Sequence, residues 1–232
     1  GTGAVLHTFS EDEEVPGATR LQFEYSLGGN SATTFRFFNG ICESYSLNAA
    51  VGGIAQETFN FRFSDHSAAQ NTVSTIALTQ TPPITGNRTS IRLGTSITTV
   101  SEVAIKDITI NISNEIIENR EMNTSTVSDF LYGIRSVNGT FNATFEDLTQ
   151  YNNFLAQTYS AMQIRLTSED ATSSTNHYVN INIPKWFATG NTPPIANNDQ
   201  IVQPIAFEAI YGSEAAYQVQ ISVWNADTTI SL

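Results

Sequence analysis

The sequence predicts a mainly β protein, and three observations support this prediction. Apolar and polar side chains alternate along several runs, which is the pattern of a strand with one buried face. Thr, Ser and Asn are abundant while Lys and Arg number only 10 of 232 residues, a composition that favours strands and turns over helices. Gly- and Pro-containing stretches separate the alternating runs, as turns separate strands. Hydrophobic residues make up 40%, enough for a sizeable core.

Four alternating runs give the clearest strand predictions: residues 58–64, 104–113, 178–183 and 217–224. In the first run three phenylalanines share one face, and in the second three isoleucines do so. These apolar residues are Phe59, Phe61, Phe63, Ile108, Ile110 and Ile112. We expect both sets in the core, with the intervening polar residues on the opposite face of the sheet.

One short helix is predicted over residues 148–158. Leu148, Tyr151, Phe154 and Leu155 recur at helical spacing, and Asp147 precedes them as an N-cap. The glycines at 28–29 and 52–53 lie between strand-like runs and are typical of hairpin turns.

The chain divides into two β halves at the Pro-containing stretch 81–87, giving residues 1–87 and 88–232. Residues 57–65 (ETFNFRFSD) and 139–147 (GTFNATFED) are identical at five of nine positions. An internal duplication explains this echo, and chance similarity in a chain rich in Thr, Asn and Phe is the alternative.

Charge argues against a protein that grips nucleic acid. The formal net charge is -12, and no cluster of Lys or Arg is present in the sequence. An acidic surface repels DNA, so the charge is compatible with DNA sliding past the protein. The simpler explanation is that acidic surfaces keep a protein soluble.

The sequence contains no recognisable catalytic, cofactor or metal motif, so we predict a structural, non-enzymatic protein. His7, His66 and His177 are far apart and lack a partner at metal-ligand spacing. The acidic run at residues 11–14 is most simply an exposed loop, with a calcium site as the alternative. Cys42 is the single cysteine, and no apolar run reaches the length of a membrane span.

Several segments, taken in order along the chain, resemble the tail tube (major tail) proteins of long-tailed, siphovirus-type phages. They are residues 7–9, 15–19, 35–47 with the glycines at 52–53, 114–115, 139–147, 181–185 and 199–209. The resemblance implies a two-sheet β-sandwich with a flanking helix. It also implies that one sheet joins its neighbours in a β-barrel around a channel, in rings that stack helically. Family members are longer at the N-terminus, so the first half is expected to be incomplete at its start.

The resemblance further implies a virion structural protein that is assembled in the bacterial host cytoplasm. Its partners would be copies of itself in trimeric or hexameric rings, together with tail terminator, tail tip and tape measure proteins. Double-stranded DNA would pass through without specific binding during ejection, and no membrane or cofactor would be involved. The echo favours the threefold ring of a duplicated subunit.

On this hypothesis the polar strand faces line the channel. The lining residues would be Thr58, Asn60, Arg62, Ser64, Asp107, Thr109, Asn111, Ser113, Thr140, Asn142, Thr144 and Glu146. Arg62 is the one cation among them, and we expect a neighbouring carboxylate to pair with it. The segment 114–137 is predicted to be a long loop that contacts the next ring. Its contact residues would be Glu118, Arg120, Glu121, Phe130 and Tyr132.

Two other functions remain open from the sequence. One is a carbohydrate- or surface-binding β-sandwich module of a secreted or fibre protein, which typically presents clustered aromatic side chains. Trp186 and Trp224 are the candidates for such exposure, because the phenylalanines are predicted to point inward. The other is a different virion component, such as a connector or decoration protein.

Overall fold

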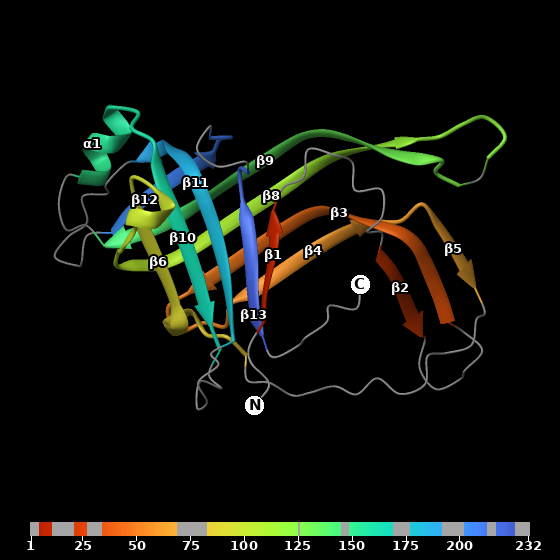
Figure 1. The fold of residues 1–232 in the computed structure, drawn as a ribbon, viewed down its shortest axis with the longest axis horizontal. Helices are drawn as coiled ribbons and strands as arrows, with labels where there is room; N and C mark the ends of the chain where they lie inside the picture. Colours follow the sequence, from red (N-terminus) through yellow and green to blue (C-terminus); the bar gives the residue numbers. More distant parts are fainter. Residues whose placement is uncertain are drawn as a thin grey trace.

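The structure is a computed structural model that describes residues 5–10, 21–26, 34–68, 83–124, 126–144, 149–168, 177–191, 202–212 and 217–225. Within these ranges 13 strands form one hydrogen-bonded sheet, and every strand pair is antiparallel (Figure 1). The prediction of a mainly β protein with one short α-helix is therefore confirmed.

The strands are β1 (Val5–Ser10), β2 (Leu21–Ser26), β3 (Thr34–Ala50), β4 (Gln56–Arg62), β5 (Asp65–Ala68), β6 (Thr89–Gly94), β7 (Ser101–Glu102), β8 (Ile105–Asn119), β9 (Asp129–Thr144), β10 (Ser160–Thr167), β11 (Tyr178–Asn191), β12 (Val202–Ala209) and β13 (Gln220–Asn225). The helix α1 is Thr149–Leu155, and two 3-10 turns, η1 and η2, are Gly86–Arg88 and Ile97–Thr99. The long path through the sheet is β4-β3-β8-β9-β12-β11-β10-β6-β7.

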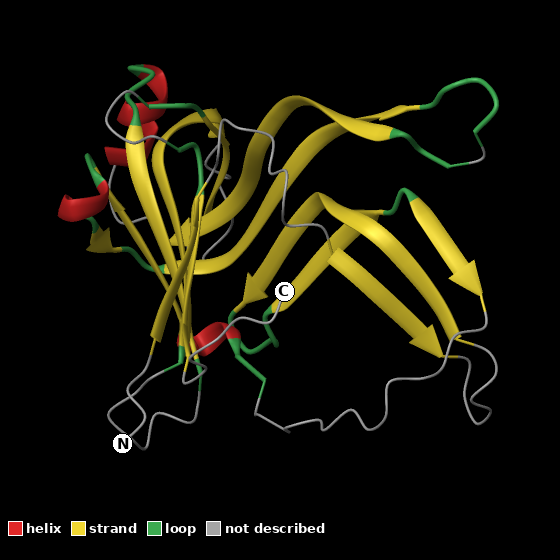
Figure 2. Ribbon diagram, turned by 45° about the vertical axis from the view of Figure 1, so that its right-hand side comes forward, coloured by secondary structure: helices red, strands yellow, loops and turns green. Residues whose placement is uncertain are grey.

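The expected two layers arise from one continuous sheet that folds over itself (Figure 2). Strand β11 is where the sheet branches, because its residues 186–191 pair with β12 and its residues 178–182 pair with β13. Side chains of β3, β8 and β9 pack against those of β6, β10 and β11 in one apolar cluster. Burial of this cluster is the main force that holds the two layers together.

The alternating runs explain this core. Ile108 and Ile110 of β8 are at most 1% exposed, as the alternation predicted, and Ile181 and Ile183 of β11 are fully buried. Phe141 of β9 lies deep in the same cluster, with its ring 5.8 Å from that of Trp186 and 6.0 Å from that of Phe207.

The two halves of the chain share this sheet and this core. Strand β3 of the first half pairs with β8 of the second along seven residue pairs, from Ser44 with Ser113 to Ala50 with Asp107. The predicted turn at residues 52–53 joins β3 to β4, and Gly52 there has a φ of 78°, which glycine adopts without strain. The predicted turn at residues 28–30 lies outside the described residues.

Helix α1 follows β9, as predicted, but it ends at Leu155, three residues before the predicted end. Gln157 adopts a left-handed φ of 50°, and the amides of Gln157 and Thr158 bond back to the carbonyls of Phe154 and Asn153. This is the hydrogen-bond pattern that terminates many helices. The predicted cap, Asp147, lies outside the described residues.

The segment 114–137 is not the long loop that the sequence predicted. Strands β8 and β9 stay paired beyond a bulge near Glu115, from Ile116 with Tyr132 to Asn119 with Asp129. We call this projecting hairpin, residues 115–134, the arm. Its base has a small core of its own, formed by Ile41, Ile116, Val127 and Phe130. Only residues 120–128 connect the two strands.

Candidate functional site: a polar face on four adjacent strands

The most extensive functional feature is a polar face on β4, β3, β8 and β9. The strand registers place its side chains in four rows across the sheet: Asn60–Ser44–Ser113–Ser136, Thr58–Ser46–Asn111–Asn138, Gln56–Asn48–Thr109–Thr140 and Ala50–Asp107–Asn142. The opposite face of β3, β8 and β9 carries buried apolar residues of the core. The face is thus a consequence of strict alternation, with short hydroxyl and amide groups on one side.

Hydrogen bonds between strands tie some of these side chains together. The Asn60 amide donates to the Ser44 hydroxyl at 2.7 Å, and the Asn48 amide donates to the Thr109 hydroxyl at 3.5 Å. Asn142 donates to both carboxylate oxygens of Asp107, at 2.8 and 2.9 Å. Side chains held in this way present a fixed surface of hydroxyl and amide groups.

The formal charge of this face is negative. Asp107 is the one charged residue in the four rows, and Glu208 of β12 continues the second row beyond Asn138. Neither Lys nor Arg occurs in any row. Most of the affinity of proteins for a nucleic acid backbone comes from such cations, so this face lacks the groups that would hold phosphates strongly.

The structure places most of the twelve sequence-predicted residues on this face. Eight of them occur in the rows: Thr58, Asn60, Asp107, Thr109, Asn111, Ser113, Thr140 and Asn142. Thr144 ends β9 on the same alternation, Ser64 lies past the end of β4, and Glu146 is outside the described residues. The prediction missed the contribution of β3, where Ser44, Ser46 and Asn48 alternate with apolar residues and could have been found by the same pattern.

Arg62 has the carboxylate partners that the sequence led us to expect. Its guanidinium donates to Glu43 at 2.5 Å and to Glu118 at 3.2 Å. Glu43 foremost, and Glu118 after it, raise the pKa of Arg62. Arg120 in turn donates twice to Glu118, at 2.7 and 2.9 Å, so two cations and two carboxylates form one network at the base of the arm.

The five residues predicted to contact another ring differ in their accessibility. Arg120 and Glu121 are exposed, Tyr132 is 40% exposed and Glu118 is held by its two arginines. Phe130 is 3% exposed and belongs to the small core of the arm, so the prediction that it forms a contact surface was wrong. Its side chain stabilises the arm instead.

The phenylalanines of β4 do not lie in the core, which corrects the sequence prediction. Phe59 is 50% and Phe61 38% exposed, because no second layer formed by the described residues covers this part of the sheet. The two rings belong to an aromatic row in which neighbouring ring centres are 4.9 to 6.4 Å apart. The row runs through Tyr45, Phe59, Phe61, Phe63, Phe37 and Phe23.

The tryptophans named as candidates for exposure are also placed differently. Trp186 is 3% exposed, and Trp224 is half-buried with its ring stacked on Tyr178. Clustered exposed aromatics therefore do occur in this protein, but they are the phenylalanines of the aromatic row.

In the part of the chain that the structure describes, no three His, Cys, Asp or Glu side chains converge in a way that could hold a metal ion. The acidic run at residues 11–14 lies outside that part. Among the described helices, none has the length and apolar character that a membrane crossing requires.

Comparison with known proteins gives an assignment for nearly the whole chain. A family sequence model described as "Phage tail tube protein" matches residues 2–209. A similar solved structure is the cryo-EM structure of the anti-feeding prophage cap (AFP tube terminating cap). That chain is 20% identical, with a TM-score of 0.46 over 64% of this chain and 97% of the cap chain. No curated protein sequence matches. Because the family model covers far more than half of the sequence, this chain belongs to the phage tail tube protein family.

Proposed function

We propose that this structural protein of the phage tail is the repeating subunit of the tail tube, and that its rings stack around a channel for DNA. The observation that carries the proposal is the polar face of β4, β3, β8 and β9. Its four rows contain no Lys or Arg, and Arg62 beside them is paired with two carboxylates. In the assembled tube this face lines the channel.

The chemistry of the polar face favours the passage of DNA over the binding of DNA. DNA binds proteins chiefly through Lys and Arg contacts to its phosphates, and each such contact would retard a moving duplex. Hydroxyl and amide groups that already bond to one another, together with Asp107 and Glu208, leave the phosphates with weak or repulsive contacts. The network around Arg62 supports the same interpretation, since two carboxylates neutralise this cation.

Open strand edges support lateral assembly. Among the described residues β4 pairs only with β3, and the Asp129–Val137 part of β9 pairs only with β8. Unpaired edges promote association with other strands, and closing a barrel through neighbours removes them. We therefore propose that β4 of one subunit pairs with β9 of the next around the ring.

Strand count favours six subunits in a ring. Six copies of four strands give 24 strands, and at about 4.8 Å spacing and about 40° tilt these enclose a backbone ring about 48 Å wide. Three copies would enclose about 24 Å, which side chains would narrow to less than the roughly 20 Å that a duplex with grooves about 8 Å deep requires.

The orientation of the echo also favours six single-unit subunits over three duplicated ones. Strands β4 and β9 carry the two copies of the echo, and the intervening antiparallel pairs make them run in opposite directions. Rotation about a channel axis would relate repeated units that run in the same direction. We therefore propose that residues 1–87 and 88–232 act together as one tube unit.

Electron microscopy of the purified chain tests the proposal. We expect open-ended tubes with a regular axial repeat, and six subunits in an end-on view of a ring. Dispersed monomers at assembly concentrations would contradict the tube, whereas threefold rings would contradict only the subunit count. Tail terminator, tail tip and tape measure proteins would then be the partners at the ends and inside the tube of the virion.

The exposed aromatic row is the one observation that favours a carbohydrate- or surface-binding function instead. Such modules use aromatic rings as platforms, but their sites also place polar groups beside the rings to fix orientation. Phe61 has Phe59 and Phe63 as its neighbours along the row, and the Tyr45 ring beside Phe59 is buried with its hydroxyl bonded to Glu57. Glycan arrays and binding to bacterial envelopes test this function, and binding that Phe59→Ala abolishes would favour it over the tube.

A further inference from the structure

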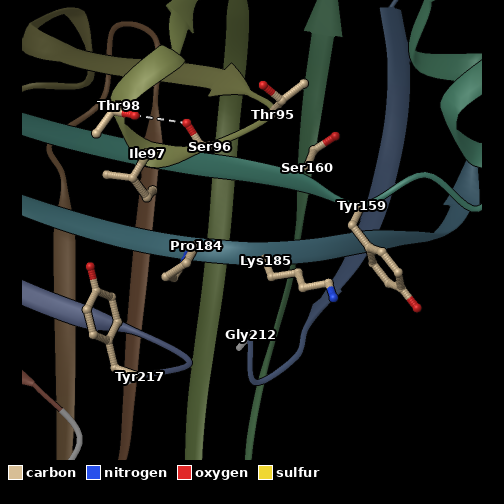
Figure 3. Close-up of a pocket in the computed structure, with 10 residues that line it drawn as sticks. All are labelled: Thr95, Ser96, Ile97, Thr98, Tyr159, Ser160, Pro184, Lys185, Gly212 and Tyr217. Atoms are coloured by element: carbon tan, nitrogen blue, oxygen red, sulfur yellow. Dashed lines mark hydrogen bonds between the residues drawn. The ribbon is translucent and has the colours of Figure 1, made fainter. Parts of the chain in front are cut away.

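A pocket of about 480 Å³ lies near α1, at the start of β10 (Figure 3). Its walls present the hydroxyls of Ser96 and Ser160 and the rings of Tyr159 and Tyr217, and Lys185 is the only charged residue among those that line it. The Lys185 ammonium lies 4.2 Å from the centre of the Tyr159 ring, which places a positive charge within the pocket. The volume is within the range of about 300–1,000 Å³ that accommodates a drug-sized group.

One wall of the pocket is held in place by its own hydrogen bonds. Ser96 precedes η2; its amide donates to the Thr99 hydroxyl at 3.2 Å, and its own side chain accepts from the Thr99 amide. These reciprocal bonds fix the turn that carries the wall. This wall of the pocket is therefore preformed.

The tip of the arm is a compact knob with the opposite charge. The amide and hydroxyl of Thr124 both bond to the Glu121 carbonyl, which closes a tight turn. The turn leaves the Met122 side chain fully exposed. Because the charge of Arg120 is matched by Glu118, Glu121 makes the tip acidic.

The knob and the pocket lie at opposite ends of the long axis of the molecule. Figure 1 shows α1 and the start of β10 at one end and the tip of the β8–β9 hairpin at the other. The two surfaces therefore cannot meet within one chain. A copy displaced along this axis brings the knob of one subunit towards the pocket of the next.

We infer that the arm tip of one subunit inserts into this pocket of a second copy in the adjacent ring. Met122 enters between the rings of Tyr159 and Tyr217, where its sulfur gains aromatic contacts, and Glu121 faces Lys185. A contact between two different surfaces repeats without closing, which is what a growing stack requires. The inference rests on the proposed tube function and identifies the surface that receives the arm.

A charge swap in the full chain tests this contact. In Glu121→Lys and in Lys185→Glu, like charges would oppose each other across the interface. We expect each single variant to raise the protein concentration needed for tube formation at least about tenfold. The double variant Glu121→Lys/Lys185→Glu restores the attraction and should assemble close to the parent concentration. Glu115→Lys is the matched control, because it makes the same charge change on the arm but away from its tip.

The outcomes separate this inference from the proposed function. Thermal melting of the monomers first checks that every variant is folded. The arm–pocket contact is wrong if the single variants form tubes as the parent does, or if the double variant recovers no assembly. In both cases the parent tubes still support the proposed function. If the parent itself gives only monomers, both the contact and the tube function fail.

Discussion

Arg62 of β4 and Glu118 of β8 are 56 residues apart in the sequence, and their side chains meet at 3.2 Å. This bond joins the edge strand of the polar face to the base of the arm. The other members of the charge network, Glu43 and Arg120, extend the connection to β3 and to the start of the segment 120–128 that joins β8 to β9. The direction in which the arm projects therefore depends on a surface charge network as well as on the small core around Phe130.

Arg62→Ala should loosen the arm without unfolding the protein. The Arg62 side chain is 39% exposed, so solvent screens its ion pairs and the melting temperature should change little. Loss of the link should raise amide hydrogen exchange in residues 115–132 several-fold while β10 and β11 keep their protection. Arg120→Ala removes the other partner of Glu118 and serves as the comparison. Unchanged exchange in Arg62→Ala would show that the apolar contacts alone hold the arm.

The same network predicts a pH dependence. Hydrogen bonds from Arg120, and less so from Arg62, lower the pKa of Glu118 below its ordinary value of 4.5. A depressed folded-state pKa stabilises above the unfolded value, and this contribution is lost as the pH falls through the folded value. Exchange protection of the arm should therefore drop below about pH 4.5 and recover on return to neutral pH. Glu118→Gln should flatten this dependence, and an unchanged profile in that variant would assign the effect to other carboxylates.

Phe59 and Phe141 occupy the same position in the two copies of the echo, and they should respond differently to truncation. Phe141 is 1% exposed between Trp186 and Phe207, so Phe141→Ala should cost about 3–5 kcal/mol of unfolding free energy. Phe59 is half exposed, so Phe59→Ala should cost the folded monomer about 1 kcal/mol. Urea unfolding of the two monomeric variants measures both. Equal losses would mean that the β4 face is covered in the monomer after all.

Gly139 allows close packing of β9 on β12. A Cβ there would overlap the Thr109 carbonyl oxygen and lie 2.8 Å from the ring of Phe207. Gly139→Ala should therefore destabilise the monomer by about 1–3 kcal/mol in urea unfolding. At Gly190 the added Cβ would meet only Ala206 at an ordinary 3.6 Å, so Gly190→Ala is the control and should be close to neutral. Similar losses in both variants would show that the close contacts at Gly139 are not the cause, because the effect of an added Cβ on the unfolded chain is stabilising and common to both variants.

Cations introduced on the polar face should make the tube retain DNA. Asn111 and Thr140 are exposed members of the rows, so Asn111→Lys/Thr140→Lys should fold and assemble. Tubes of this variant should hold nuclease-protected duplex DNA at low salt and release it as salt rises, because phosphate contacts displace counterions. Ile134→Lys adds a cation on the arm, outside the rows, as a control. Equal DNA retention by the control would argue that the rows do not line the channel.

The sequence predicted the strands better than it predicted what covers them. Alternation correctly predicted the buried isoleucines of β8 and the buried face of β11, because in the folded protein a second layer of strands packs against both. The same alternation in β4 gave Phe59 and Phe61 a common face, yet nothing in a single strand reveals whether another layer lies above it. An alternating sequence pattern predicts which residues share one face of a strand. Whether that face is buried depends on strands that are distant in the sequence.

The alternating run predicted from the sequence ends at Ser113, and the segment 114–137 that follows it was predicted as a loop. The structure shows that a bulge at this point shifts the register, after which β8 and β9 continue to pair. The polar face was predicted only in part, and the reason is related. Its β4, β8 and β9 members were found individually, but the pairing of β3 with β8 that joins them into rows depends on tertiary structure.

The arm at one end of the long axis and α1 at the other give the molecule a direction (Figure 1). Any filament built by repeating one displacement along that axis inherits this polarity. The two ends of such a filament then differ in chemistry: one end presents acidic arm tips, and the other presents the pockets around Lys185. A protein that starts the filament and a protein that stops it would have to recognise different surfaces, and subunits could add at one end while the other stays closed.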